Sequence, residues 1–320
     1  SEVTVTLALP FIEVPIKDDL VRAAHGAVSR VDPALQVRIQ PVEMSQQERA
    51  TFMARSEKVD SRPASPVNDI SHVVAVLSGK GGVGKSSVAA LLAAALRRRE
   101  KQVGVLDADI TGPSIPKMFF PDGARLGMSP MGPTPPQTEA GIKVMSVNLL
   151  LEQEDMAVIW RGPLISGAIK QFWGDIFWGS LDYLIVDLPP GTSDASLTVM
   201  QSLPMSGIVL VSSPQDLAGM VVRKAAQMAG QMNTPILGLI ENMSYFECPD
   251  TGKRYEIFGP SHAEETAQTI GVPFLGRLPI DPEIAQLCDA GRVENYGAEA
   301  FAPIAEVLAE RAPEAQRAAF

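Results

Sequence analysis

A glycine-rich segment in the first third of the chain has residue types and spacing suited to phosphate binding. Residues 79–87 read Gly-Lys-Gly-Gly-Val-Gly-Lys-Ser-Ser, which fits the pattern of a glycine, four intervening residues and then Gly-Lys-Ser. Glycines let the backbone curl so that several N–H groups converge on phosphate oxygens at the positive end of the following helix. The segment is therefore predicted to bind the phosphates of ATP.

Each position of this loop has an expected role. The predicted nucleotide-binding residues are Gly79, Gly81, Gly82, Val83, Gly84, Lys85, Ser86 and Ser87. Lys85 is expected to neutralise the β- and γ-phosphates during catalysis, and Ser86 to coordinate Mg²⁺. An apolar segment at 73–77 precedes the loop and an alanine- and leucine-rich segment at 86–99 follows it. This is the expected strand–loop–helix context.

Three aspartates are candidates for the remaining chemistry. Asp187 ends an apolar segment, immediately before Leu-Pro-Pro-Gly, and we expect it to face the loop and hold Mg²⁺ through water. Asp107 and Asp109 lie in Leu-Asp-Ala-Asp at the end of another apolar segment, where one of them is expected to orient the attacking water. The alternative for all three is structural, because aspartates at strand ends also cap turns.

The elements that would position these side chains are predicted from short apolar segments in residues 71–320. Five segments qualify: 73–77, 103–106, 183–186, 208–211 and 236–240. They lack the alternation of a half-exposed strand, so both faces of their sheet are expected to be covered, as in parallel sheets. Helical segments, including 86–99 and 217–232, separate them. The pattern predicts an α/β domain with a doubly wound, mostly parallel sheet.

Two other segments of this domain have weaker patterns. Residues 121–141 are rich in Pro and Gly and show no periodicity, so they are expected to form a long loop. Residues 298–312 are expected to form a C-terminal helix that packs on the domain.

Residues 1–57 are predicted to form a separate, small α+β module. Its expected elements are a strand at 3–9, a helix at 17–31, a second strand around 37–39 and a second helix at 45–55. Residues 58–70 are polar and contain two prolines, which is typical of a linker.

Charge and composition argue against several classes of protein. The net charge of −10 argues against a broad nucleic-acid-binding surface, which would favour basic residues. The longest apolar runs are far shorter than the roughly 20 residues of a membrane-spanning helix, and the N-terminus lacks the basic flank of a signal peptide. Two cysteines, Cys248 and Cys288, make no disulfide framework, so a cytoplasmic protein is expected. Cys288 lies at helical spacing among apolar residues and is expected to pack rather than bind metal.

The loop carries a second lysine, Lys80, in addition to Lys85. In this it resembles the deviant Walker A ATPases, which include the nitrogenase iron protein and the division-site and partition ATPases. In that class the extra lysine reaches across a dimer interface to the partner's nucleotide. The resemblance therefore implies a homodimer that encloses ATP between its subunits, with Lys80 as a catalytic residue.

Four further segments narrow the resemblance. They are Trp-Arg-Gly-Pro at 160–163, Asp-Tyr-Leu-Ile-Val-Asp-Leu-Pro-Pro-Gly-Thr at 182–192, Ser-Pro-Gln at 213–215 and Glu-Asn-Met-Ser at 241–244. With them, residues 70–300 resemble the Mrp/NBP35 family of ATPases. Residues 3–57 are similar to the latter part of the MIP18-type domain that precedes the ATPase in many bacterial members.

The resemblance implies a fold, an activity and several residue roles. Members of the family are doubly wound homodimeric ATPases, described as carriers or scaffolds that pass iron–sulfur clusters to apo-proteins. The family's motifs place Asp109 in switch I as the catalytic aspartate, Asp187 as the Walker B residue and Asn242 at the adenine. Without the family, Asn242 would equally fit a turn. Slow hydrolysis, coupled to a conformational switch of the dimer, is the expected activity.

The sequence departs from the family at its metal-binding motif. Iron–sulfur carriers of the family have Cys-x-x-Cys shortly after the Asn-Met-Ser segment, whereas this chain reads Cys248-Pro-Asp-Thr251. One reading is that Cys248, paired across the dimer and helped by Asp250 or external thiols, still holds a labile cluster. A second is that it binds another metal or reacts as a redox thiol. The third is a turn cysteine without chemistry.

Three functions consequently stay open at the level of sequence. The first is an ATPase that assembles or delivers iron–sulfur clusters. The second is an ATP-switched regulatory or scaffold protein that has lost cluster binding because Thr251 replaces the second cysteine. The third is a metabolic enzyme that uses the same loop for phosphoryl transfer or ATP-driven ligation.

Overall fold

The structure, a computed structural model, divides the chain into two units, Ser1–Arg62 and Pro63–Ala319. The residues that it describes are 2–9, 21, 25, 28, 36–43, 68–109, 112, 114–146, 149, 162–192, 194–215, 220–297 and 299–315. The boundary between the units falls within residues 58–70, for which a linker is predicted.

The N-terminal unit contains two paired strands. β1 (Glu2–Leu9) and β2 (Gln36–Glu43) run parallel, in a register that joins Glu2 to Gln36. Both predicted strands are therefore confirmed. A parallel pair needs a long crossover connection, and residues 21, 25 and 28 within this connection are helical. The predicted helix at 45–55 lies outside the described residues.

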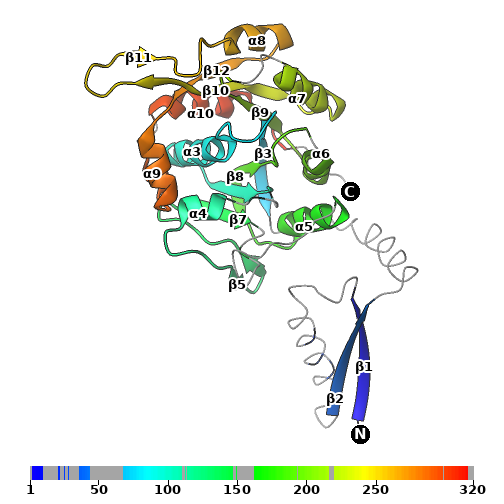
Figure 1. Cartoon of the computed structure of the whole chain (residues 1–320). Helices are drawn as coiled ribbons and strands as arrows, with labels where there is room; N and C mark the ends of the chain where they lie inside the picture. The colour runs from blue at the N-terminus through cyan, green and yellow to red at the C-terminus, as the bar shows by residue number, and fades with distance from the viewer. Residues whose placement is uncertain are drawn as a thin grey trace. The chain divides into compact units, whose positions relative to one another are not determined.

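The second unit is built on an eight-stranded sheet (Figure 1). Its strands are β3 (Asp69–Ser78), β4 (Val103–Asp107), β7 (Lys143–Ser146), β8 (Ser180–Asp187), β9 (Gly207–Ser212), β10 (Ile236–Glu247), β11 (Arg254–Tyr255) and β12 (Phe274–Pro279). The order is β11-β10-β9-β3-β8-β4-β7, with β12 also paired to β10. All of these pairs are parallel except β10 with β11. The predicted doubly wound, mostly parallel sheet is confirmed.

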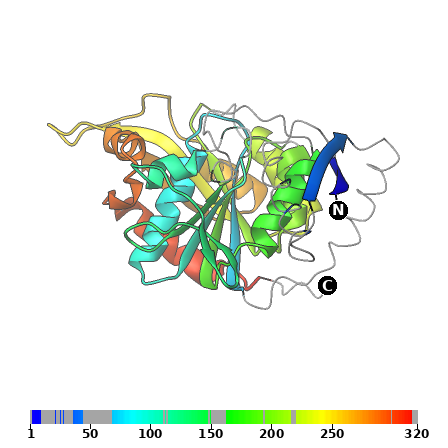
Figure 2. The same ribbon diagram turned by 90° about the horizontal axis from the view of Figure 1, so that it is seen from below.

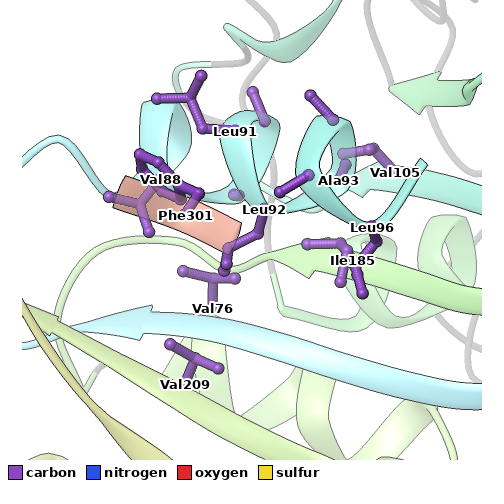
Figure 3. Packing of buried hydrophobic residues seen from close by; sticks show 14 of the residues in the cluster. Val76, Val88, Leu91, Leu92, Ala93, Leu96, Val105, Ile185, Val209 and Phe301 are labelled. Carbon is purple, nitrogen blue, oxygen red and sulfur yellow. The ribbon is translucent and has the colours of Figure 1, made fainter. Parts of the chain in front are cut away.

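Helices cover both faces of this sheet (Figures 1 and 2). One face carries α3 (Lys85–Arg98), α4 (Ile115–Phe119), α9 (Pro282–Asp289) and α10 (Ala302–Arg311). The other carries α5 (Gly162–Gly174), α6 (Asp194–Ser202), α7 (Met220–Gln231) and α8 (Ala263–Ile270). Because neighbouring strand residues point to opposite faces, Val74 and Val76 join the first core while Val73 and Ala75 join the second. Figure 3 shows Leu92 of α3 lying over Val76.

Several elements differ from those that the sequence predicts. The five apolar segments are strands, but β3 begins at Asp69, inside the predicted linker, and β10 continues to Glu247. Residues 121–141 contain a small hairpin, β5 (Gly127–Ser129) with β6 (Gly132–Thr134), where a loop without structure is predicted. Strands of three residues are too short to produce a readable periodicity.

The two predicted helices flanking the central strands are present, and the C-terminal one differs in detail. α3 and α7 lie within the predicted segments or one residue beyond them. Near the C-terminus a 3₁₀ turn, Glu299–Phe301, precedes α10. Within the described part of the chain, every helix is too short or too polar to cross a membrane.

Candidate nucleotide-binding site

The phosphate loop joins the carboxyl end of β3 to the first turn of α3. Gly82 and Gly84 have φ values of 81° and 75°, a left-handed conformation that glycine adopts without a steric penalty. Gly84 caps α3, and its carbonyl accepts a hydrogen bond from the Val88 N–H at 3.0 Å. A Cβ atom at Gly84 would lie 2.3 Å from Nδ2 of Asn242. Both conformation and space therefore require glycine at this position.

A pocket of about 270 Å³ lies over the loop. Its lining comprises Ser78, Lys80, Gly81, Gly82, Gly84, Lys85, Ser86, Ser87, Asp109, Ser114, Met118 and Pro190. Most of the predicted loop residues, together with Lys80 and Asp109, therefore meet around one cavity. Sequence reasoning missed Ser114 and Met118, because the short helix α4 that carries Met118 has no amphipathic pattern long enough to read.

Beneath the pocket, Asp187 at the end of β8 contacts two residues of the loop. Its Oδ1 lies 2.5 Å from Nζ of Lys85, and its Oδ2 accepts a hydrogen bond of 2.5 Å from Oγ of Ser86. Lys85 and Asp187 are 6% and 0% exposed. Burial raises the pKa of the Asp187 carboxyl, although Lys85 and Ser86 oppose this effect. The expectation that Asp187 faces the loop agrees with this geometry.

The two aspartates at the end of β4 have different surroundings. Asp107 is fully buried, and its Oδ2 accepts hydrogen bonds from the N–H groups of Ser114 (2.9 Å) and Ile115 (3.0 Å). Its Oδ1 accepts one from the Asp109 N–H at 3.2 Å. Burial and the neighbouring Asp187 raise the pKa of Asp107 to about 8. Asp107 therefore orders the segment that leads into α4, while Asp109 is the aspartate that lines the pocket.

Asn242 lies within β10 rather than in a turn. It is buried, and its Nδ2 donates a hydrogen bond of 2.9 Å to the backbone carbonyl of Val83. The structure thus brings Asn242 to the back of the phosphate loop but not into the lining of the pocket. Its predicted contact with adenine stays a prediction.

Cys248 stands at a tight turn just after β10. Its N–H donates to the Lys253 carbonyl at 3.0 Å, and its carbonyl accepts from the N–H groups of Thr251 (3.3 Å) and Gly252 (2.8 Å). A hydrogen bond from the Thr251 side chain, with backbone N–H groups of Asp250 and Thr251, lowers the pKa of the Cys248 thiol. The threonine in the place of the second motif cysteine therefore favours the thiolate.

The second cysteine behaves as the sequence predicts. Cys288 lies in α9, packed against one of the two cores, and burial raises the pKa of its thiol. Among the described residues, no group of three or more His, Cys, Asp or Glu side chains is placed to hold a metal ion. Within the described part of the chain, Cys248 is therefore the thiol placed to bind iron, without a complete ligand set around it.

A family model now places these features in a known group. The model for ParA, described as the NUBPL iron-transfer P-loop NTPase, matches residues 69–312. The chain belongs to this family.

Relatives of this chain include several proteins named iron-sulfur cluster carrier protein. That of Clostridium perfringens is 45% identical over 251 residues, which are 76% of this chain and 88% of the relative. That of Methanocaldococcus jannaschii is 48% identical over 233 residues, 72% of this chain and 80% of the relative. The Synechocystis protein is 37% identical over 317 residues, 96% of this chain and 87% of its own. This match includes the N-terminal unit.

Solved structures agree with the fold of the NUBPL-type ATPase unit. A nucleotide-binding protein from Archaeoglobus fulgidus, solved in complex with ADP, has a TM-score of 0.66 and 48% identity, covering 72% of this chain and 91% of that one. The cell division ATPase MinD of Pyrococcus furiosus has a TM-score of 0.54 at 21% identity, covering 75% and 99%. The second likeness concerns the fold alone.

Proposed function

We propose that this chain binds and hydrolyses ATP as a homodimer and uses the nucleotide to control the transfer of an iron–sulfur cluster to apo-proteins. The observation that carries the proposal is the contact of Lys85, Ser86 and Asp187 beneath a pocket lined by the phosphate loop. The family, and the names of the relatives, support the cluster as cargo.

Nucleotide binding in this proposal uses residues 79–87. Backbone N–H groups of the loop bind the phosphates at the start of α3. When the nucleotide binds, Lys85 leaves its buried partner Asp187 and pairs with phosphate oxygens. The positive charge of Lys85 is therefore compensated both before and after nucleotide binding. Ser86 and Asp187 present adjacent oxygen atoms, the donor type that Mg²⁺ prefers, and therefore fit this ion. Mg²⁺, when bound, supplies positive charge against the phosphates.

Hydrolysis depends on residues at the rim of the pocket. Asp109 accepts a hydrogen bond from a water molecule and directs its oxygen at the γ-phosphorus. The new P–O bond forms as the bond between the γ-phosphorus and the β,γ-bridging oxygen breaks, the water proton passes to the released phosphate, and ADP leaves. Lys80 of the partner subunit offsets the charge on the transferred phosphoryl group. Asn242 contacts the adenine. The expected turnover is slow and is coupled to closure and opening of the dimer.

Cargo binding in this proposal uses Cys248. A symmetric dimer brings two Cys248 thiolates together, fewer than the four that usually hold a cluster. Asp250 carboxylates or external thiols complete the set, so the cluster is held loosely and is readily passed on. Exposed apolar side chains beyond the turn, at Tyr255, Ile257 and Phe258, are suited to contact with a protein. The N-terminal residues 1–57 serve as a MIP18-type module, joined by residues 58–70 to the ATPase domain 71–320.

A second function is favoured by Thr251. Its hydroxyl is a poor iron ligand, and it hydrogen bonds to Cys248. In this alternative the protein is an ATP-switched scaffold that binds protein partners without a cluster.

Anaerobic reconstitution with iron and sulfide separates the two functions. We expect the wild-type chain to gain cluster absorbance that is weakly retained, Cys248→Ala to lose it, and Thr251→Cys to retain it more strongly. Transfer to an apo-acceptor is measured in the same samples. If wild-type protein binds ATP but neither takes up nor transfers a cluster, the carrier function is wrong and the scaffold remains.

A further inference from the structure

A path of polar contacts begins at the back of the phosphate loop. Asn242 donates a hydrogen bond to the carbonyl of Val83, next to the glycine that caps α3. The space beside Gly84 is filled by the same amide. Because phosphate binding sets the direction of the loop N–H groups, rotation of the peptide at Val83 must shift Asn242 or break this bond. β10 is thus in direct mechanical contact with the nucleotide site.

β10 is irregular just beyond this contact. In its pairing with β12, Glu241 faces Arg277 and Tyr245 faces Pro279, so residues 242–244 span an interval that Leu278 alone spans in β12. Met243 has a φ of 55°, a left-handed conformation that costs free energy in a residue other than glycine. Bulges bend the strand that carries them and recur next to active sites, and strained residues of this kind cluster at switch regions. It lies between the loop and the Cys248 turn.

Arg277 of β12 connects this bulge to Glu256, which lies on the far side of the Cys248 turn along the chain. Its Nε donates a hydrogen bond of 2.5 Å to Oγ of Ser244 and lies 3.6 Å from Oε2 of Glu241, which is 2% exposed. Ser244 itself donates to the same Glu241 oxygen. Nη2 of Arg277 also pairs with Oε1 of Glu256 at 2.5 Å. Glu256 directly follows β11, the strand that returns from Cys248 and pairs with the end of β10.

We propose that Arg277 is a positioning residue that couples nucleotide occupancy of the phosphate loop to the conformation of the Cys248 turn. This inference rests on the proposed nucleotide binding, and it adds the route of regulation. A shift of Asn242 changes the conformation of the bulge. Arg277 moves with its partners Ser244 and Glu241, and its ion pair with Glu256 transmits the movement to the β10–β11 hairpin that contains the Cys248 turn. The planar guanidinium binds the bulge residues and Glu256 at the same time through different nitrogen atoms. A lysine has a single ammonium group and cannot make both contacts in this geometry.

The test measures alkylation of Cys248 by iodoacetamide in the full chain, resolved by peptide mass spectrometry so that Cys288 is counted separately. Rates are compared without nucleotide and with magnesium and a nonhydrolysable ATP analogue. We expect a change of at least about fivefold in the wild type, the lower end of typical coupling. In Arg277→Lys and in Glu256→Gln the change should fall below about twofold. Binding of the analogue is titrated in every variant.

Arg254→Lys is the matched control. Arg254 lies on β11. Its guanidinium lies 4.4 Å from the centre of the Tyr245 ring, which Arg277 also contacts at 5.7 Å, and it pairs with Glu247 at 2.8 Å. These partners, Glu247 and the Tyr245 ring, lie beyond bulge residues 242–244, so this variant should respond to nucleotide as the wild type does. The Arg277→Lys/Glu256→Gln double variant should respond to nucleotide no less than either single variant, because both substitutions interrupt the same path.

The outcomes separate this inference from the proposed function. If the wild type binds the analogue and the labelling rate of Cys248 does not change, or if Arg277→Lys responds like the wild type, the coupling role is overturned. If the wild type binds no nucleotide, the proposed function itself is wrong and the inference falls with it. Should Arg277→Lys fail to fold, Glu256→Gln decides, because Glu256 is exposed and its ion pair lies at the surface.

Discussion

At the scale of single residues, two neighbouring lysines and two neighbouring aspartates divide into different roles. Lys85 is buried against Asp187, whereas Lys80 lines the pocket. The carboxyl oxygens of Asp107 accept hydrogen bonds from backbone N–H groups, whereas Asp109 lines the pocket. Identical residue types separated by a few positions thus differ because burial and hydrogen bonding differ.

Substitutions of Lys85 and of Asp109 should have different effects on ATP binding and on the rate of hydrolysis. Lys85→Ala is expected to weaken ATP binding by at least about a hundredfold, because charge-assisted hydrogen bonds are worth about 1.5–3 kcal/mol each. Asp109→Ala should retain binding and lower kcat by about 10²–10⁴-fold, as expected for loss of a residue that positions water. Equilibrium titration with a fluorescent ATP analogue and a phosphate-release assay measure the two effects. Equal losses of binding in both variants would contradict this division.

The Cys248 thiol should titrate below the ordinary range. Because the hydrogen bond from Thr251 lowers the pKa of this thiol, the thiolate persists to lower pH, and the midpoint of the pH–alkylation profile should lie below that of an ordinary cysteine. Thr251→Val, which keeps the shape but removes the hydroxyl, should move the midpoint upward. Thr251→Ser restores the hydroxyl and serves as the control. A profile that is the same in all three proteins would rule out a role for Thr251.

At the scale of elements, the ends of parallel strands bring the chemistry together. β3, β4 and β8 are adjacent, and their carboxyl ends carry the phosphate loop, Asp107 with Asp109, and Asp187. Asp107 and Asp187 are direct neighbours in the register. This agrees with the general placement of ligands at the carboxyl edge of open α/β sheets.

The short helix α4 should depend on Asp107. Asp107→Ala removes the acceptor for three backbone N–H groups, and we expect the free energy of unfolding to fall by about 1–3 kcal/mol. Asp107→Asn keeps one oxygen for the N–H groups of Ser114 and Ile115, so its loss should be smaller. Urea denaturation, monitored by circular dichroism, compares the two variants. Similar losses would show that the hydrogen bonds to Ser114 and Ile115 do not account for the stabilisation.

At the scale of the whole molecule, the active assembly is proposed to be a dimer with nucleotide between its subunits. Lys80 lies at the rim of a pocket that is built from loop backbone, Asp109 and α4. In a dimer of this kind the lysine of one subunit completes the charge around the nucleotide of the other.

Lys80→Ala should therefore impair hydrolysis and ATP-dependent dimer closure while ATP still binds each subunit. The expected loss of turnover is roughly 10²-fold or more, the magnitude typical for removal of one group that stabilises transition-state charge. Light scattering with and without a nonhydrolysable analogue measures the dimer, and phosphate release measures turnover. An unchanged turnover rate would argue against the sandwich arrangement.

Much of the fold follows from local patterns, and the elements that were missed have identifiable causes. The five central strands are buried on both faces, so their continuous apolar segments were readable. The sequence does not predict β12, because Gly276 and Arg277 interrupt its apolar pattern. The hairpin at 127–134 and α4 depend on tertiary contacts, such as the hydrogen bond of 2.8 Å from the Phe177 N–H to the Pro133 carbonyl.

The sequence by itself determined the phosphate loop, because glycine conformation, lysine charge and serine oxygen act over a few neighbouring residues. The residue pattern alone left Asp107 and Asp109 open, and the family resemblance implied Asp109, which the tertiary structure places in the pocket lining. Only the tertiary structure showed that Asn242 supports the loop from behind. It alone also placed Arg277 between β10 and the Cys248 hairpin. These contacts join segments that are far apart in the chain. They are determined by burial and by strand pairing across the sheet, which no local sequence pattern encodes.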